Sequence, residues 1–329
     1  MDNHTWSQRP FLSFDPEECI RDTVNKVDLT SPEHDGLDYR VSSACTTTTE
    51  SRSLLDELSY DSKAGDFVIA LIKLSSSIDL RLDVDQAVLV VRHLQLMLEL
   101  NATTNLTSVR NPAKALVLHA LDSLLFARMF TELGIVSASQ DEDARVCRDL
   151  AVRCLDMGTG GGFPGIPLAC VLPMDVTLLD SVGKKVSACN GFARQLGLNG
   201  RVHAIHERLE EFGRNERRSF DVIVARALAS LDVLIEYAEP LVTEAGYLII
   251  SKGTPDTQEL EDVQYVSKLC GFELVSRETI ELPYEMGTRN LYVYKKVTVS
   301  SVKLPRKVGE ARKHPLALRR NVSRETRRG

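Results

Sequence analysis

The first half of the chain carries apolar residues at helical spacing. Between residues 84 and 98 they recur every three or four positions and line one side of an amphipathic helix, for which Asp83 is a suitable N-cap. A second helix is expected from Asn111, which is followed by a proline at the first helical position, to the region of Gly134. The spacing therefore predicts an N-terminal helical region over residues 66–140.

The second half alternates between short apolar runs and amphipathic segments. Five runs of strand length occur between residues 150 and 251, and helical patterns separate them. This alternation predicts a doubly wound α/β sheet. Two further strand-like runs, 272–282 and 289–296, have no helix between them and should pair as an antiparallel hairpin. We therefore predict a mostly parallel sheet with a C-terminal antiparallel hairpin, in a domain that spans residues 141–298.

The two ends of the chain show neither pattern and differ in charge. Residues 1–65 include a low-complexity run, "VSSACTTTTESRS", and are expected to form a disordered acidic extension. Residues 303–329 contain 10 bases and 2 acids, although the whole chain has a net charge of −6. A basic arm on an acidic protein suits a nucleic-acid contact, and a solvated tail explains the same composition. We assign residues 299–329 to a basic C-terminal tail.

Composition narrows the class of protein. The chain is 43% hydrophobic and 26% charged, as in a soluble globular protein, and no apolar run approaches the length of a membrane span. The acidic N-terminus lacks the apolar stretch of a secretory signal. Seven scattered cysteines without a C-x-x-C pair indicate a reducing compartment and argue against a zinc site. We expect a cytoplasmic monomer without a metal and without membrane contact.

Candidate chemistry lies in the stretch "CLDMGTGGGFPGIPLACV", residues 154–171. From Asp156 it has an acid followed by glycines at Gly158 and Gly160, as in a loop that binds S-adenosylmethionine. From Gly160 onward it also has the G-x-G-x-x-G spacing of a dinucleotide loop. In both cases the glycines allow positive φ angles and a close approach of the backbone to the ligand.

Two features favour the adenosylmethionine loop. Dinucleotide loops usually have an apolar residue where this chain has Asp156, which is expected near the amino group of the methionine part. The terminal antiparallel hairpin is typical of class I methyltransferases, whereas a dinucleotide sheet keeps its strands parallel. Asp180 ends the second predicted strand, where an acid accepts hydrogen bonds from ribose hydroxyls in either class. We therefore predict S-adenosylmethionine as the cofactor, bound in part by Gly158, Gly160 and Asp180.

The ordered set of motifs resembles the bacterial glucose-inhibited division protein B family, the 16S ribosomal RNA guanine-N7 methyltransferases. The resemblance is carried by "DMGTGGGFPGIPLA", "LLDSVGKKVSACNGFARQLGL", "FDVIVARALASL" and "LIISKG". In addition, "NLTSVRNPAKALVLHALDSLLF" is similar to the N-terminal signature of the family, and "LPRKVGEARKHPL" to the basic tail of many members. The match covers about residues 85–316.

This resemblance implies a substrate and a set of contacts. The methyl donor would be S-adenosylmethionine, the acceptor guanine N7 in the 530-loop region of 16S ribosomal RNA, and the product 7-methylguanosine. The donor-contacting positions of the family fall on Gly158, Phe163, Leu209, Glu210 and Arg226. The chain departs from the family at residue 228, where a leucine replaces a frequent aromatic residue, which could alter packing at the acceptor pocket.

The residues themselves fit guanine N7 chemistry. The segment "ARALASL" after the fourth predicted strand lacks the Asn/Asp-Pro-Pro-aromatic motif of amine-methylating enzymes. Cytosine C5 chemistry requires a cysteine at a strand end, but Cys170 and Cys189 fall in helical stretches. Guanine N7 has a free lone pair and needs no deprotonation, so orientation alone can supply much of the catalysis. We name no catalytic residue.

Several residues have two interpretations at this point. Glu210 contacts the donor or is a solvated acid at a helix start. Arg226 binds the donor carboxylate or an RNA phosphate, or forms a surface ion pair. His119 contacts substrate or is structural. We also predict that four basic residues contact RNA phosphates and position the RNA without reading its sequence: Arg306, Lys307, Arg312 and Lys313.

Three functions compete on the sequence alone. The first is the RNA methyltransferase, whose partner is 16S ribosomal RNA or a precursor particle of the small subunit. The second is an NAD-dependent oxidoreductase, favoured only by the overlapping G-x-G-x-x-G spacing. The third is a non-catalytic RNA-binding protein of the same fold, against which the complete glycine loop argues.

Overall fold

The computed structural model describes residues 62–136, 152–226 and 228–317. It also describes six separate positions near the N-terminus, namely Glu17, Cys19, Arg21, Thr23, Leu55 and Leu58. Most of the expected acidic extension, and the end of the basic tail beyond residue 317, therefore lie outside the described residues.

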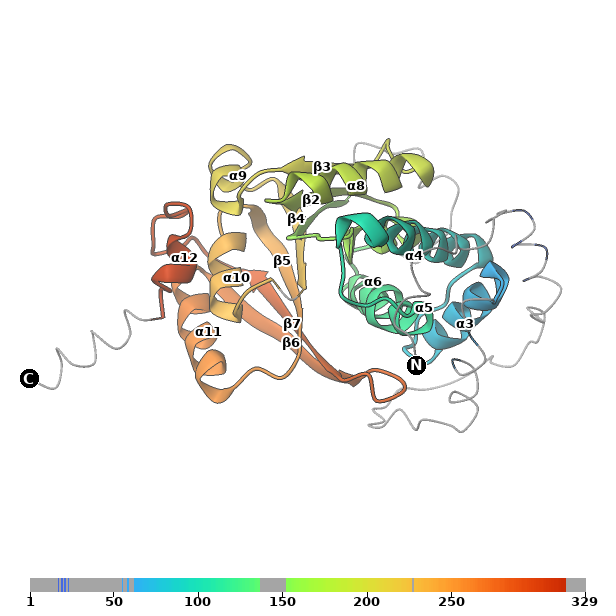
Figure 1. The fold of residues 1–329 in the computed structure, drawn as a ribbon. Helices are drawn as coiled ribbons and strands as arrows, with labels where there is room; N and C mark the ends of the chain where they lie inside the picture. Colours follow the sequence, from blue (N-terminus) through green and yellow to red (C-terminus); the bar gives the residue numbers. More distant parts are fainter. Residues whose placement is uncertain are drawn as a thin grey trace, which may run out of the picture.

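A seven-stranded sheet forms the centre of the protein, with the strand order β3-β2-β1-β4-β5-β7-β6 (Figure 1). Strands β1 to β5 are parallel, whereas β7 runs antiparallel to both β5 and β6. The predicted parallel sheet with a terminal hairpin is therefore confirmed. The strands are β1 Val152–Met157, β2 Met174–Asp180, β3 Val202–His206, β4 Phe220–Arg226, β5 Val242–Lys252, β6 Phe272–Glu281 and β7 Thr288–Lys296.

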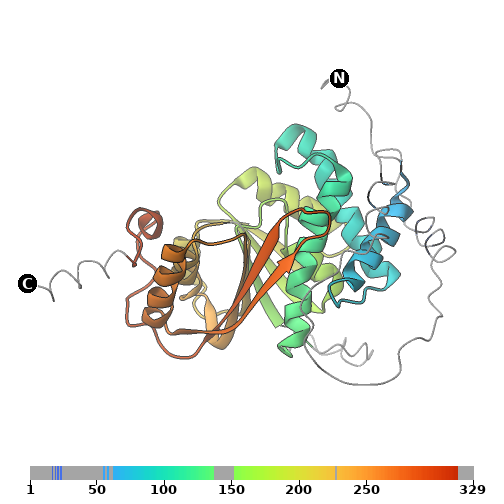
Figure 2. The ribbon, with the colours of Figure 1, turned by 90° about the horizontal axis from the view of Figure 1, so that it is seen from below.

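Helices cover both faces of the sheet. Successive strand residues point to opposite faces, and both faces carry apolar side chains that the helices bury. On β4, Val222 and Val224 belong to one apolar core, and Ile223 and Ala225 to the other. The first core is shared with α3 Ala64–Ser76, α4 Val84–Thr104, α5 Pro112–Ala115, η1 Leu116–Leu121, α6 Asp122–Glu132, α7 Gly165–Val171 and α8 Gly183–Gln195. The second is shared with α9 Leu209–Asn215, α10 Leu231–Ala238, α11 Thr257–Leu269 and α12 Glu310–Lys313. Figure 2 shows the two groups on either side of the sheet.

The predicted N-terminal helices begin at the expected caps. The Asp83 carboxylate accepts a hydrogen bond from the backbone N–H of Gln86 at 2.7 Å, and the Asn111 side chain accepts one from Lys114 N–H at 2.9 Å. The second helix differs from the prediction in its interior, where η1 is one wide π-helical turn between α5 and α6. Such turns are rare and frequently occur at functional sites, and this one contains His119.

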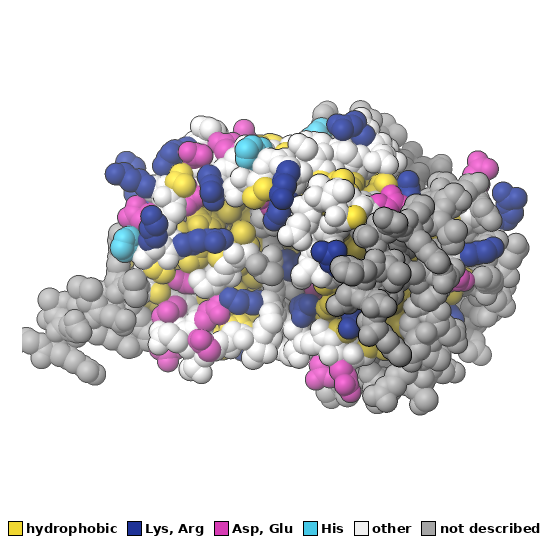
Figure 3. Space-filling model, in the orientation of Figure 1, with side chains coloured by type: hydrophobic (Ala, Val, Ile, Leu, Met, Phe, Trp, Pro, Cys, Tyr) yellow, Lys and Arg dark blue, Asp and Glu magenta, His cyan; other side chains and the backbone are white. Residues whose placement is uncertain are grey.

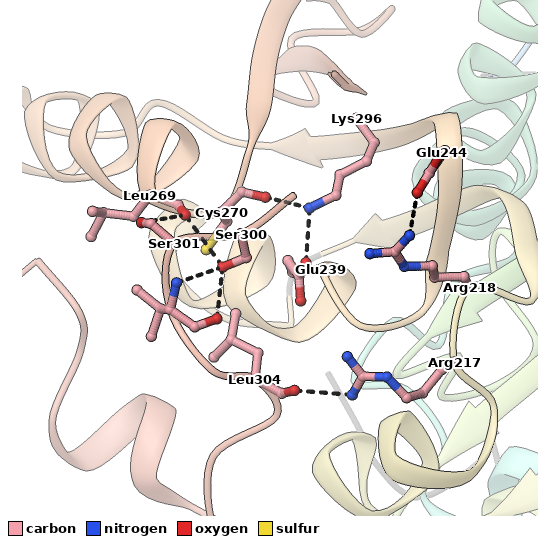
Figure 4. Close-up of polar contacts among 11 residues, drawn as sticks. Arg217, Arg218, Glu239, Glu244, Leu269, Cys270, Lys296, Ser300, Ser301 and Leu304 are labelled. Carbon is pink, nitrogen blue, oxygen red and sulfur yellow. Dashed lines mark hydrogen bonds and ion pairs between the residues drawn. The ribbon is translucent and has the colours of Figure 1, made fainter. Parts of the chain in front are cut away.

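The chain beyond β7 returns to the second face of the sheet (Figure 4). At the end of β7 the buried Lys296 pairs with Glu239 at 2.8 Å. Further on, Arg217 donates a hydrogen bond to the carbonyl of Leu304 at 3.0 Å. These bonds tie the end of β7 and the chain after it to segments that precede β5.

Residues 304–317, the C-terminal segment from here on, are packed on the domain. Leu304 and Leu316 are buried in the second core. The guanidinium of Arg306 is only 9% exposed and forms two bonds to the Glu236 carboxylate, at 2.7 and 2.5 Å, and a third to the carbonyl of His314 at 2.8 Å. The phosphate contact predicted for Arg306 is therefore corrected, because this cation is committed to a buried acid.

We expect Arg306→Ala to lower the free energy of unfolding by about 3–5 kcal/mol, since it leaves the buried Glu236 carboxylate without its partner. Urea unfolding measures the change. Lys307→Ala is the matched control, because it removes the same charge one residue later from an exposed side chain; its effect should stay within about 0.5 kcal/mol. Equal effects of the two substitutions would contradict the structural role of Arg306.

Candidate active site

The glycine loop between β1 and α7 folds back onto the end of β2. The backbone N–H groups of Gly158 and Thr159 both donate to the carbonyl of Leu179, at 2.8 and 3.1 Å. Gly160 has a φ angle of +61°, and a Cβ built on it would meet nothing closer than 4.0 Å. This residue therefore presents open, uncovered backbone, which a ligand can approach closely.

The Asp156 side chain is hydrogen-bonded to this loop at two points. Its Oδ2 accepts hydrogen bonds from the Thr159 hydroxyl at 2.7 Å and from the Gly165 N–H at 2.9 Å. The side chain is 1% exposed, and burial raises the pKa of the carboxyl to about 6. The other oxygen, Oδ1, is buried without a hydrogen-bond partner, and the expected position of Asp156 near the methionine amino group stays a prediction.

Asp180 connects the end of β2 to the same loop. One carboxylate oxygen accepts from the Gly160 N–H at 3.0 Å, the other accepts from the Val182 N–H at 2.9 Å, and Lys185 Nζ lies 3.9 Å away. The structure therefore brings Gly160 and Asp180 together at the carboxyl edge of the sheet. Each carboxylate oxygen can accept a further bond, so these contacts leave capacity for ribose hydroxyls, and that role of Asp180 stays a prediction.

Phe163, at the end of the glycine loop, lies between two histidines. Its ring centroid is 4.3 Å from that of His93 on α4 and 5.1 Å from that of His119 on η1. Burial lowers the pKa of His93 to about 3. Burial and the charge of Arg226 lower the pKa of His119 to about 4. Both rings are therefore neutral at pH 7, and they pack the helical region against the loop.

Arg226 shares a buried acid with a second arginine. Its Nη1 lies 3.2 Å from Asp122 Oδ2 on α6 and donates to the carbonyl of Leu118 at 3.3 Å. Arg289 at the start of β7 reaches the same Asp122 oxygen at 3.0 Å. Because Asp122 is only 2% exposed, this is a buried pair and not the surface ion pair considered above. Two cations on one anion leave a positive excess, which suits either the donor carboxylate or an RNA phosphate.

Glu210 lies in the first turn of α9, next to Leu209, and is 6% exposed. Its Oε1 accepts a hydrogen bond from the N–H of Gly309 in the C-terminal segment at 2.7 Å. The alternative of a solvated helix-start acid is therefore wrong. The role of Leu209 and Glu210 in donor binding stays a prediction.

The Leu228 side chain covers the glycine loop at Gly158. A Cβ built on Gly158 would lie 2.6 Å from Leu228 Cδ1, so this side chain sits directly over the glycine. The exposed Arg312 donates a hydrogen bond to the Leu228 carbonyl at 2.9 Å. The other two predicted phosphate contacts, Lys307 and Lys313, are exposed.

Sequence reasoning missed His93 and Arg289. His93 occupies a position on the buried side of a helix and carried no motif. Arg289 lies 167 residues from its partner Asp122, at the start of β7, where only the fold shows its neighbour. Among the described residues, no group of three His, Cys, Asp or Glu side chains is arranged to hold a metal ion.

The strand order, the open glycine loop and the acid at the end of β2 define a class I methyltransferase, a class that uses S-adenosylmethionine as methyl donor. The antiparallel β7 disfavours the dinucleotide alternative. The loop fits the cofactor for two reasons. Gly160 leaves room for a ligand beside its backbone, and its N–H is bonded to Asp180, the acid expected to bind the ribose.

The chain belongs to the rRNA small subunit methyltransferase G family, whose model matches residues 86–283. The protein named ribosomal RNA small subunit methyltransferase G of Alkaliphilus oremlandii is 33% identical over 231 residues, which are 69% of this chain and 89% of the relative. The protein of the same name from Desulforamulus reducens is 33% identical over 255 residues, 77% of this chain and 99% of the relative. The predicted family is therefore confirmed.

Asp180→Ala should weaken the binding of S-adenosylhomocysteine by about 1–3 kcal/mol, as expected when hydrogen bonds to a charged group are lost. Isothermal titration calorimetry measures the change. Asp175→Ala removes an exposed acid from the amino-terminal half of the same strand and should leave the affinity unchanged. Binding of NAD without any response to S-adenosylhomocysteine would overturn the cofactor assignment.

The buried histidines predict an acid-sensitive fold. Their pKa values are lower in the folded protein than the usual 6.5, so their stabilising effect is complete above pH 6.5 and is lost as the pH falls toward 4. Between pH 7 and pH 5 each should cost up to about 2 kcal/mol of unfolding free energy. His93→Phe should reduce the fall by that amount in urea titrations, whereas a substitution of the exposed His203 should not. If the unfolding free energy of His93→Phe falls between pH 7 and pH 5 by as much as that of the wild type, this account is refuted.

Proposed function

We propose that the protein transfers a methyl group from S-adenosylmethionine to N7 of a guanine in the 530-loop region of 16S ribosomal RNA, which makes 7-methylguanosine. Membership of the rRNA small subunit methyltransferase G family supports the reaction and the kind of RNA. The observation that carries the proposal is the glycine loop, which joins Gly160 to Asp180 at the carboxyl edge while Phe163 packs on the substrate side against Arg226. Ligands of open α/β sheets bind at that edge.

Methylation of guanine N7 fits the neutral histidines of this site. The reaction requires no proton acceptor, because N7 already carries an accessible lone pair. The two histidines beside Phe163 have low pKa values and are neutral. When bound, the cofactor supplies an electrophilic methyl group. The chain's own residues then have to orient the base and exclude water, which are contributions that can reach about 7–11 kcal/mol in the best cases.

The proposed task of Arg226 is to bind the carboxylate of the donor. Its guanidinium lies 5.8 Å from the centre of the Phe163 ring and is 14% exposed, so it keeps an accessible part after pairing with Asp122. Because Arg289 also holds Asp122, that acid retains a partner if Arg226 engages the donor. An RNA phosphate is the second ligand that this positive excess suits.

The proposed RNA surface lies over α9, α10 and α12, where Lys and Arg side chains gather on the face shown in Figure 3. Arg312 and Lys313 lie on α12, Lys307 precedes this helix, and all three are exposed. Contacts of this kind neutralise phosphates and set the orientation of the RNA. We propose 16S ribosomal RNA, free or in a precursor of the small subunit, as the partner.

We further propose that the protein acts as a monomer in the cytoplasm. The location rests on the ribosomal RNA in the name of the relatives, and the monomeric state is kept as a prediction from the sequence. Over the residues that the structure describes, no helix combines the length and the apolar character that a membrane crossing requires.

The purified protein should incorporate methyl groups from S-adenosylmethionine into 16S ribosomal RNA, and reduction with aniline cleavage should map 7-methylguanosine to the 530 loop. Arg226→Ala should lower kcat/KM by about 10- to 150-fold, the factor that corresponds to losing a bond to a charged group. The matched control is Arg153→Ala on β1, whose side chain is 53% exposed and pairs with Asp221; it should retain wild-type activity.

Two results would contradict the proposal. Binding of the RNA without methyl transfer would favour the non-catalytic RNA-binding protein. A methyl group found on an exocyclic amine or on a ribose would refute the assignment to guanine N7.

A further inference from the structure

The C-terminal segment, residues 304–317, lies beside α9 and α10 (Figure 1). Arg306 is anchored on Glu236 of α10, and Arg214 of α9 donates to the Arg306 carbonyl at 3.4 Å. Both helices follow strands that end at the carboxyl edge of the sheet. Glu236 and Arg214 lie in the second half of their helices, so these two bonds anchor the segment, and its contacts with the carboxyl edge come from other residues.

One contact reaches the first turn of α9. The N–H of Gly309 donates to Glu210 Oε1 at 2.7 Å, and Gly309 has a φ angle of +79°, a conformation that glycine adopts without strain. Glu210 is 6% exposed, so its carboxylate is oriented by this backbone group and not by water. The bond fixes the turn that contains both Leu209 and Glu210.

A second contact reaches the loop between β4 and α10. Arg312 donates to the carbonyl of Leu228 at 2.9 Å, while Lys252 donates to the carbonyl of the next residue, Ala229, at 3.3 Å. Two cations from different elements thus hold two successive carbonyls of this loop. The held residue is the one whose side chain covers Gly158.

We propose that Arg312 is a positioning residue of the donor site, which acts through the carbonyl of Leu228 and sets the wall over Gly158. The C-terminal segment then serves the donor side of the reaction as well as the RNA side. This inference rests on the proposed function, because it assigns the loop around Gly158 to S-adenosylmethionine.

Arg312 is well suited to a test, because its neighbour provides the control. Arg312 and Lys313 are adjacent on α12, both are exposed, and both carry one positive charge. Neither substitution uncovers the core, since the buried members of the segment are Leu304, Ala311, Leu316 and Ala317. A role in phosphate binding predicts similar effects of the two substitutions, whereas a positioning role predicts an effect of Arg312 alone on the donor.

The experiment compares the full-length wild type, Arg312→Ala and Lys313→Ala by calorimetric titration with S-adenosylhomocysteine. We expect the dissociation constant of Arg312→Ala to rise about 2- to 10-fold, the factor that corresponds to one hydrogen bond. Lys313→Ala should match the wild type, and all three proteins should have the same melting temperature. In steady-state methylation, Arg312→Ala should raise the KM for S-adenosylmethionine, and its KM for RNA should equal that of Lys313→Ala.

Equal or tighter binding of S-adenosylhomocysteine by Arg312→Ala overturns the inference and leaves the proposed function intact. The same holds if Lys313→Ala weakens donor binding as much, or if Arg312→Ala changes only the KM for RNA. A wild-type protein that binds no S-adenosylhomocysteine removes the proposed function, and the inference falls with it.

Discussion

The site depends on two buried carboxylates that hold one glycine loop. Asp156 bonds to the loop at Thr159 and at Gly165, and Asp180 bonds to the N–H of Gly160. Glycines at positive φ have weak conformational preferences, so such a loop needs fixed acceptors to keep one shape. The cost of burying Asp156 is visible in its raised pKa. The open backbone over Gly160 is the result of this arrangement.

The helical region is joined to the same site by Asp122, a buried acid that two arginines share. Asp122 on α6 binds Arg226 from β4 and Arg289 from β7, while His119 on η1 lies against Phe163. Removing one partner of a buried ion pair is costly, so helices, loop and hairpin are expected to respond together to changes there. The region before β1 therefore contributes to the wall of the site as well as to the core.

The sequence predicted the elements whose signals are local. The caps at Asp83 and Asn111 and the succession of strands and helices along the chain needed only neighbouring residues. The π-helical turn at His119 was not predicted, because no local signal in the sequence marks it, and the contact of His119 with Phe163 joins residues 44 positions apart in the chain. The partnership of Asp122 with Arg289 was equally invisible, because it forms only once β7 lies beside β5.

The C-terminal segment shows why charge composition alone misleads. Its bases suggested either a solvated tail or an arm for RNA, and both interpretations treat every cation alike. In the structure Arg306 is buried on Glu236, Arg312 holds a loop carbonyl, and Lys313 is exposed. The apolar residues between these bases were the overlooked signal, since Leu304 and Leu316 can be buried only if the segment packs. Once it packs, cations on one short segment acquire different neighbours, and therefore different tasks.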